Sequence, residues 1–427
     1  MKYRYNPVIN TIIFCFLLTY LSFAQNPGTL DKTFGNEGKV SVGIGGYFDV
    51  AHEVALQSDG KIVVAGYGRE SSSSFKGLSI ARYLQERNLD YDFGSLGLIQ
   101  KQTTTMEGEL NSIAIQKDDK ILAVGYSISS TTNNEDITLV RFNKNGQLDK
   151  SFGNNGMVLT EISDQKEIGE SVAIQPDGKI IVVGTTQHNP GPDIVLARYD
   201  EYGQLDFYFG DAGTVITNIT PGPDIGKSLV IQRDGKIIVA GFSYSADNFF
   251  MTLLRYDSNG ILDSTFGKGG IVITGFSSRV GKLDLVLQND EKIILVGSSD
   301  IDNAHHFTVI RFNNNGVIDQ SFGSNGSTRT KIGNYSEAHG VALDSNGNII
   351  VAGTAELGNE TFVVARYNPM GILDTIFGSD GLAKVHFNEK SIDRAHSVII
   401  DSNGNIIVVG ETTIDYTTFG LIRLIGK

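Results

Sequence analysis

The chain has 427 residues, with 48 acidic side chains against 35 Lys and Arg, and a formal net charge of −13. This balance argues against a protein that binds the phosphate backbone of nucleic acid, because such binding needs clustered Lys and Arg. The excess of negative charge also keeps copies of the chain apart in solution, so we expect a monomer.

The first residues predict a secretory signal peptide over 1–24. Basic residues precede an apolar run at 12–23, which is shorter than a membrane span, and small residues end it. We expect cleavage after Ala24 and an exported protein without a membrane span, in the periplasm, in the medium or on the cell surface; an uncleaved anchor is the alternative. The only cysteine, Cys15, lies in this run, so the mature chain has no disulfide and no thiol nucleophile.

The rest of the chain consists of seven copies of one sequence repeat. The string LDKTFGNEG returns in variants that begin at residues 30, 89, 148, 205, 262, 318 and 373. Each copy also holds a string such as SDGKIVVAG and a string such as SIARY, with an arginine before an apolar or aromatic residue. No stretch of the mature chain lies outside this pattern, which predicts a single domain over 25–427.

The repeated strings predict β-strands, because they are short, rich in Val and Ile and bounded by Gly, Asn and Asp. In the first repeat the expected strands are 53–56, 61–66, 78–83 and 97–100. Seven four-stranded units predict an all-β fold, a seven-bladed β-propeller, with an open solenoid as the alternative. The segment 38–42 is expected to supply the missing outer strand of the last unit and so to close the ring.

The pair of strings LDxxFGxxG and DGKIxVxG, about once per sixty residues from residue 28 to 427, resembles the delta-60 repeat family of secreted bacterial proteins. The resemblance implies a propeller-like fold and an export route. The family has no general activity, so the resemblance implies no reaction.

Several repeated residues have a structural explanation. The turn QSDGK at 57–61 should place Gly60 in the left-handed region, and Glu291 at the same position of a later repeat predicts another turn type there. Each arginine of the third string stands about eight residues before an aspartate, across a turn, which predicts a repeated Arg–carboxylate pair. The phenylalanine of each Phe-Gly step is expected to pack between units.

Loops of variable sequence occupy one face of the predicted propeller: 67–77, 126–136, 185–193 and 242–249. Recognition is expected on that face, because loops on a rigid frame carry function. Near it, the position two residues before the core of each first strand changes from repeat to repeat. It is occupied by His52, Asn111, Glu170, Lys227, Leu283, His339 and His396.

Of these, His52, Asn111, Glu170, Lys227, His339 and His396 are the predicted ligand-binding residues. The three histidines fall in consecutive repeats of a closed ring, with Asp49, Glu337 and Asp393 near them in sequence. Imidazoles at a channel mouth, oriented by carboxylates, can bind a divalent metal ion. The alternative is a polar ring in a water-filled channel, and no other cofactor is expected.

The sequence contains no nucleophile elbow and no phosphate-binding glycine loop. It therefore predicts an exported scaffold without catalysis, which binds an extracellular protein or polysaccharide through its variable loops. Two alternatives stay open: an extracellular hydrolase or lyase with a site at the channel mouth, and a structural component of the cell surface.

Overall fold

The computed structural model describes residues 26–427 except 73, 87–88, 102–106, 129–133, 188–190 and 302–303. The predicted signal peptide at 1–24 therefore lies outside the described residues. Within the described part, every regular element is a β-strand, which confirms the all-β prediction. A search of these same residues for a helix long and apolar enough to cross a membrane found none.

Most strands form four-stranded antiparallel sheets, each made from consecutive strands. Five such sheets stand alone: β6 (Gly108–Ile115), β7 (Ile121–Ile128), β8 (Glu135–Phe142), β9 (Met157–Thr160); β10 (Glu167–Ile174), β11 (Ile180–Gln187), β12 (Pro192–Tyr199), β13 (Thr214–Thr217); β14 (Asp224–Ile231), β15 (Ile237–Ser245), β16 (Asn248–Tyr256), β17 (Ile271–Ser278); β18 (Asp284–Leu287), β19 (Ile293–Ile301), β20 (Ala304–Phe312), β21 (Ser327–Thr330); β22 (Ser336–Leu343), β23 (Ile349–Leu357), β24 (Asn359–Tyr367), β25 (Leu382–Val385).

The remaining strands belong to one eight-stranded sheet that joins the two ends of the chain. It contains β26 (Ile392–Ile400), β27 (Ile406–Thr413), β28 (Thr417–Leu424), β2 (Phe48–Leu56), β3 (Ile62–Arg69), β4 (Gly77–Tyr83) and β5 (Leu98–Lys101), with β1 (Lys39–Val42) on β28. A single parallel bridge between Phe48 and Thr417 connects its two halves. β1 pairs antiparallel with β28, from Lys39 opposite Ile422 to Val42 opposite Phe419.

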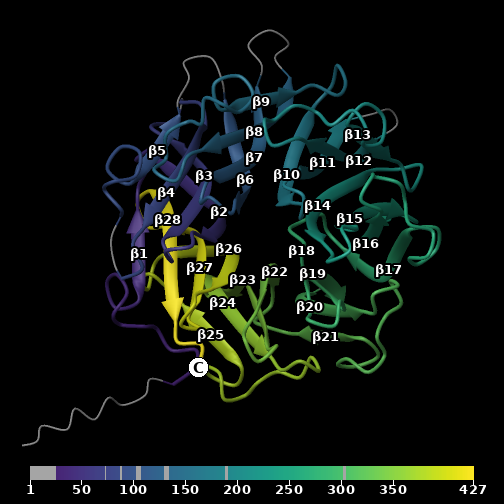
Figure 1. Cartoon of the computed structure of the whole chain (residues 1–427). Helices are drawn as coiled ribbons and strands as arrows, with labels where there is room; N and C mark the ends of the chain where they lie inside the picture. Colours follow the sequence, from purple (N-terminus) through teal and green to yellow (C-terminus); the bar gives the residue numbers. More distant parts are fainter. Residues whose placement is uncertain are drawn as a thin grey trace, which may run out of the picture.

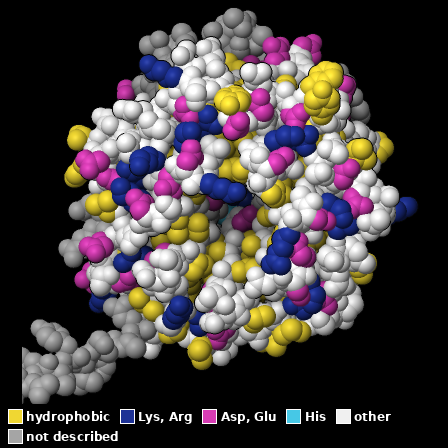
Figure 2. All heavy atoms as spheres, viewed as in Figure 1, with side chains coloured by type: hydrophobic (Ala, Val, Ile, Leu, Met, Phe, Trp, Pro, Cys, Tyr) yellow, Lys and Arg dark blue, Asp and Glu magenta, His cyan; other side chains and the backbone are white. Residues whose placement is uncertain are grey.

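The sheets stand around a centre, with the first strand of each sheet innermost (Figure 1). Each innermost strand contacts the innermost strand of the next sheet, in the order β2, β6, β10, β14, β18, β22 and β26, and β26 contacts β2. The space-filling view shows a hollow at this centre with charged side chains at its margin (Figure 2). The hydrophobic clusters lie between neighbouring sheets, so the core is divided among the sheets that stand around the hollow.

The predicted Arg–Asp pairs are present in every repeat, with nitrogen–oxygen distances of 2.7 to 2.9 Å. They are Arg82–Asp90, Arg141–Asp149, Arg198–Asp206, Arg255–Asp263, Arg311–Asp319, Arg366–Asp374 and Arg423–Asp31. Each guanidinium also lies over the repeated Phe ring, 4.3 to 4.7 Å from its centroid. Because these Phe rings are fully buried, one arginine ties a charge pair to the apolar core.

The same arginines connect each sheet to the next. In every repeat Nη1 donates to a backbone carbonyl just after the third strand of the next repeat, as Arg141 does to Glu201 at 2.5 Å and Arg311 to Pro369 at 2.6 Å. Arg423, in the last sheet, donates to the carbonyl of Gln85 in the first. The two ends of the chain are therefore joined by the interaction that joins the other sheets.

The turn between the first two strands forms as predicted where glycine is present, and Gly60 has a φ of 80°. The prediction of another turn type at Glu291 is wrong, since Glu291 keeps the left-handed conformation with a φ of 64°. Its carboxylate accepts a hydrogen bond from Gln232 at 3.3 Å and pairs with Arg233 at 3.2 Å, both in the preceding sheet. These contacts between sheets offset the strain of a non-glycine residue at positive φ.

The pair between Arg423 and Asp31 gives a test of the junction between the chain ends. Arg423→Met leaves the Asp31 carboxylate buried without its partner, so we expect it to lower the free energy of unfolding by roughly 3–5 kcal/mol. The control, Lys32→Met, breaks the Lys32–Glu37 pair, whose side chains are both 68% exposed, and should cost less than about 0.5 kcal/mol. Equal denaturation midpoints for both variants would contradict the prediction.

Candidate functional site

A β-bulge interrupts six of the seven innermost strands, and β18 is the exception. In each, the pairing register with the second strand skips one residue. The skipped residues are the predicted ligand-binding residues: His52, Asn111, Glu170, Lys227, His339 and His396. A bulged residue leaves the ladder and its side chain is re-aimed, so these positions are not restricted by packing within the ladder.

These six side chains line one cavity of about 460 Å³ at the centre of the ring. The cavity is completed mainly by Glu53, Glu109, the segment 280–284, Glu337 and Arg394. The fold thus brings all the predicted residues together, Leu283 included. Their role as a ligand site stays a prediction.

One sheet departs from the pattern. Its innermost strand, β18, has only four residues and no bulge. The preceding residues 280–283 line the cavity instead of pairing with β19. From this segment Lys282 reaches across the hollow and donates to the carbonyl of His52 at 3.2 Å.

The three histidines lie side by side. The ring centroid of His396 is 5.6 Å from that of His52 and 5.5 Å from that of His339. His339 Nδ1 lies 2.6 Å from the carbonyl oxygen of Ala395, and its Nε2 lies 3.3 Å from the carboxylate of Glu337. Both nitrogens of His339 therefore face a hydrogen-bond acceptor.

Glu337 stays ionised beside that ring. The hydrogen bond from His339 lowers the pKa of Glu337 to about 2 against the opposing effect of burial, and the Tyr335 hydroxyl also donates to it. Of Asp49, Glu337 and Asp393, only Glu337 contacts a bulge histidine among the described residues. It orients His339, as the sequence suggested.

His52 and His396 have the opposite environment. Burial lowers the pKa of both imidazoles well below the usual range, and the charge of Lys282 adds to the effect. His52 Nε2 and His396 Nδ1 are buried without a hydrogen-bond partner among the described atoms. The two rings are therefore neutral at pH 7, and each has a nitrogen free for a ligand or a proton.

The expected metal site at His52, His339 and His396 stays a prediction. A search of the described residues found no group of three or more His, Cys, Asp or Glu side chains able to hold a metal ion. Both nitrogens of His339 face protein partners, and the stacked rings of His339 and His396 lie side by side.

Two buried carboxyl groups at the first repeat and at β18 were not predicted from the sequence. Burial, aided by the charge of Asp284, raises the pKa of Glu53 to about 7, and burial raises that of Asp284 to about 6. Ser397 donates to Glu53, while Ser228 Oγ (3.0 Å) and the Val341 amide (2.9 Å) donate to Asp284. Glu53 can therefore take or give a proton near neutral pH.

Asp49 and Asp393 organise loops and do not orient the histidines. Asp49 accepts hydrogen bonds from the amides of Ile44 (2.7 Å) and Gly45 (2.8 Å). Asp393 accepts from Phe387 N at 3.1 Å and from Ser391 and Thr412. An acidic residue three positions before the bulge also occurs at Glu167 and Asp224, and this recurrence is a signal that the sequence analysis missed.

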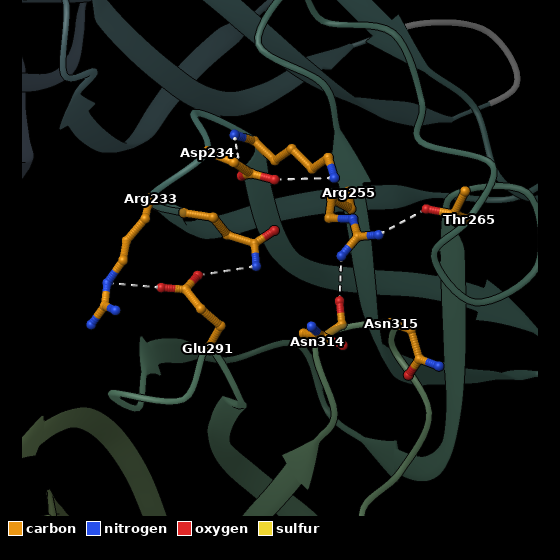
Figure 3. Close-up of a pocket in the computed structure, with 9 residues that line it drawn as sticks. Arg233, Asp234, Arg255, Thr265, Glu291, Asn314 and Asn315 are labelled. Atoms are coloured by element: carbon orange, nitrogen blue, oxygen red, sulfur yellow. Dashed lines mark hydrogen bonds and ion pairs between the residues drawn. The ribbon is translucent and has the colours of Figure 1, made fainter.

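A second cavity, of about 410 Å³, lies between two sheets on the face of the short turns. Figure 3 shows the Arg255 guanidinium there, between Thr265 and the carbonyl of Asn314, with Arg233 and Glu291 at the other side. Arg423 lines a similar cavity elsewhere on the ring. Because the cavity is formed by the repeated arginine, it belongs to the architecture.

Six segments of the chain match a family described as a domain of unknown function (DUF5122) beta-propeller. They are residues 57–93, 116–152, 175–206, 232–266, 288–322 and 345–377. The chain is a β-propeller repeat protein. The narrower resemblance of this propeller to delta-60 repeat proteins stays a prediction. A search of curated protein sequences gave no match.

Solved structures similar to the propeller include several enzymes. Polysaccharide lyase Uly1 has a TM-score of 0.50 at 11% identity, over 88% of this chain and 89% of that chain. Virginiamycin B lyase from Staphylococcus aureus has a TM-score of 0.48 at 11% identity, over 90% and 98%. Trypanosoma rangeli sialidase has a TM-score of 0.41 at 9% identity, over 92% and 60%.

These comparisons correct the main functional prediction. The sequence predicted a binding scaffold without catalysis, whereas a similar solved structure with a TM-score of 0.50 is a polysaccharide lyase. At about 11% identity the likeness itself shows the fold and no reaction.

The neutral state of His396 predicts a pH dependence of stability. Below pH 6.5 the unfolded chain binds a proton at this residue and the folded chain does not, so the free energy of unfolding falls as the pH falls. His396→Gln should remove this loss, which is roughly 1.4 kcal/mol per pH unit. Urea denaturation of both proteins at pH 7, 6 and 5 measures it, and parallel curves would refute the assignment.

Proposed function

We propose that the propeller is a hydrolase or lyase whose acid–base site is the central cavity. The observation that carries the proposal is the set of bulges, which turn six varying side chains into one cavity. There, two neutral imidazoles lie beside a ring with both nitrogens facing acceptors. Acid–base catalysis uses neighbouring titratable groups whose environments favour different protonation states.

The roles follow from the partners of each ring. His396, neutral and with an unpartnered Nδ1, is the base that takes a proton from water in a hydrolase or from a substrate carbon in a lyase. Glu53, with a pKa of about 7, is the acid that protonates the leaving oxygen as its bond breaks. Lys282, between the two sides of the hollow, holds the His52 backbone in place.

Two finer features of the architecture belong to the same proposal. The sheets form a closed ring of seven blades, with β1 as the outer strand of the last blade, which is supported by the β1–β28 pairing and by the Arg423–Gln85 contact. The protein acts outside the cytoplasm, which is supported by the signal-like pattern of residues 1–24.

Turnover tests the proposal directly. The purified protein is incubated with soluble acidic and neutral polysaccharides, and new reducing ends and new carbon–carbon double bonds are measured; the latter identify a lyase. His396→Ala and Glu53→Gln should each lower kcat by about 10²–10⁴-fold. The control Arg233→Gln changes the other cavity, on the turn face, and should keep full activity. Equal rates for all variants would exclude the central cavity as the active site.

A further inference from the structure

Two exposed tyrosines form a pair where the first and last sheets meet. Tyr47 directly precedes β2, and Tyr416 lies in the turn between β27 and β28. Their ring centroids are 6.1 Å apart with an angle of 59° between the planes. The side chains are 39% and 57% exposed, so most of one ring and part of the other are open to solvent.

The backbone holds this pair rigidly. Tyr47 N donates to the carbonyl of Arg69 at 3.0 Å, and Thr417 N donates to the carbonyl of Tyr47 at 3.4 Å. The parallel bridge between Phe48 and Thr417 lies beside it. A pair of rings fixed in this way loses little conformational entropy when a ligand stacks on it.

The pair belongs to the two sheets that supply His52 and His396. Beneath it, Phe48 stacks on Tyr67 at 6.2 Å, Tyr67 contacts His52 at 5.7 Å, and His52 contacts His396 at 5.6 Å. A row of rings therefore leads inward from the strand start that carries Tyr47 to the central cavity.

The distance along this row limits the kind of ligand. His52 lies five positions after Tyr47 along the chain, which corresponds to roughly 16 Å at about 3.3 Å per residue. A small molecule inside the cavity does not span that distance, whereas a polymer of several units does. The acidic chain disfavours a nucleic acid as that polymer, since its net charge is −13.

We propose that Tyr47 and Tyr416 are a sugar-binding platform that receives a polysaccharide chain whose next units enter the central cavity. Tyrosine suits this task because its ring offers an apolar face to the C–H groups of a sugar while its hydroxyl bonds to water or sugar oxygens. The proposal rests on the proposed function, which it extends by naming the substrate class. It assigns Tyr47 and Tyr416 to binding and leaves the proton transfers to the cavity.

Affinity electrophoresis tests the platform without relying on turnover. The full-length mature protein carrying His396→Ala is run through native gels that contain alginate, xylan or hydroxyethylcellulose, and through a gel with casein as an extended polypeptide. Tyr47→Ala combined with Tyr416→Ala should weaken polysaccharide retardation by roughly tenfold. Tyr202→Ala and Tyr208→Ala are matched controls on the turn face, where the side chains are 55% and 86% exposed, and should migrate like the parent protein.

Two further measurements separate the possible failures. Equal retardation of parent and platform variant, retardation of neither by any polysaccharide, or retardation by casein alone would each overturn the platform. The platform stands and the proposed catalysis fails if the tyrosines govern retardation while the protein with His396 intact cleaves none of the polymers. Unfolding midpoints equal to the parent exclude a general loss of structure in the variants.

Discussion

The repeated arginine is the interaction on which the rest of the propeller depends. One guanidinium pairs with the aspartate of its own turn, covers the buried Phe ring and donates to a carbonyl of the next sheet. Isolated, such a buried cation would be costly. Here the carboxylate, the ring and the carbonyl share it, so each sheet is fixed to the next by a group that cannot lose its proton.

These contacts between sheets allow the inner strands to carry irregular residues. A bulge costs ladder hydrogen bonds and twists its strand, but the second and third strands of each sheet are almost fully buried and keep the frame. The bulged residue is thereby released from packing. Arg255 and its equivalents lie at the end of the sheets that carries the short turns. The bulged side chains lie toward the other end of the inner strands.

The sequence predicted most of the fold because seven copies of one pattern leave little freedom in strand order. The alignment of repeats also selected the bulge residues, since this position carries different side-chain types from repeat to repeat. It did not show why they vary, because a bulge depends on pairing with the second strand. Glu53 and Asp284 were missed since their raised pKa values come from burial that only the closed cavity supplies. The comparison of repeats also did not predict that residues 280–283 leave the pairing with β19.

The three histidines have different environments although each of them follows an alanine. His339 has Glu337 two residues before it on the same strand, in contact with Nε2. The residue at that place is Val50 before His52 and Arg394 before His396. Neither can accept a hydrogen bond from an imidazole, and Arg394, which pairs with Glu411 at 2.8 Å, disfavours a second positive charge beside it. The residue two positions before the histidine therefore gives His339 a carboxylate acceptor that His52 and His396 lack at that place, while burial and the charge of Lys282 keep those two rings neutral.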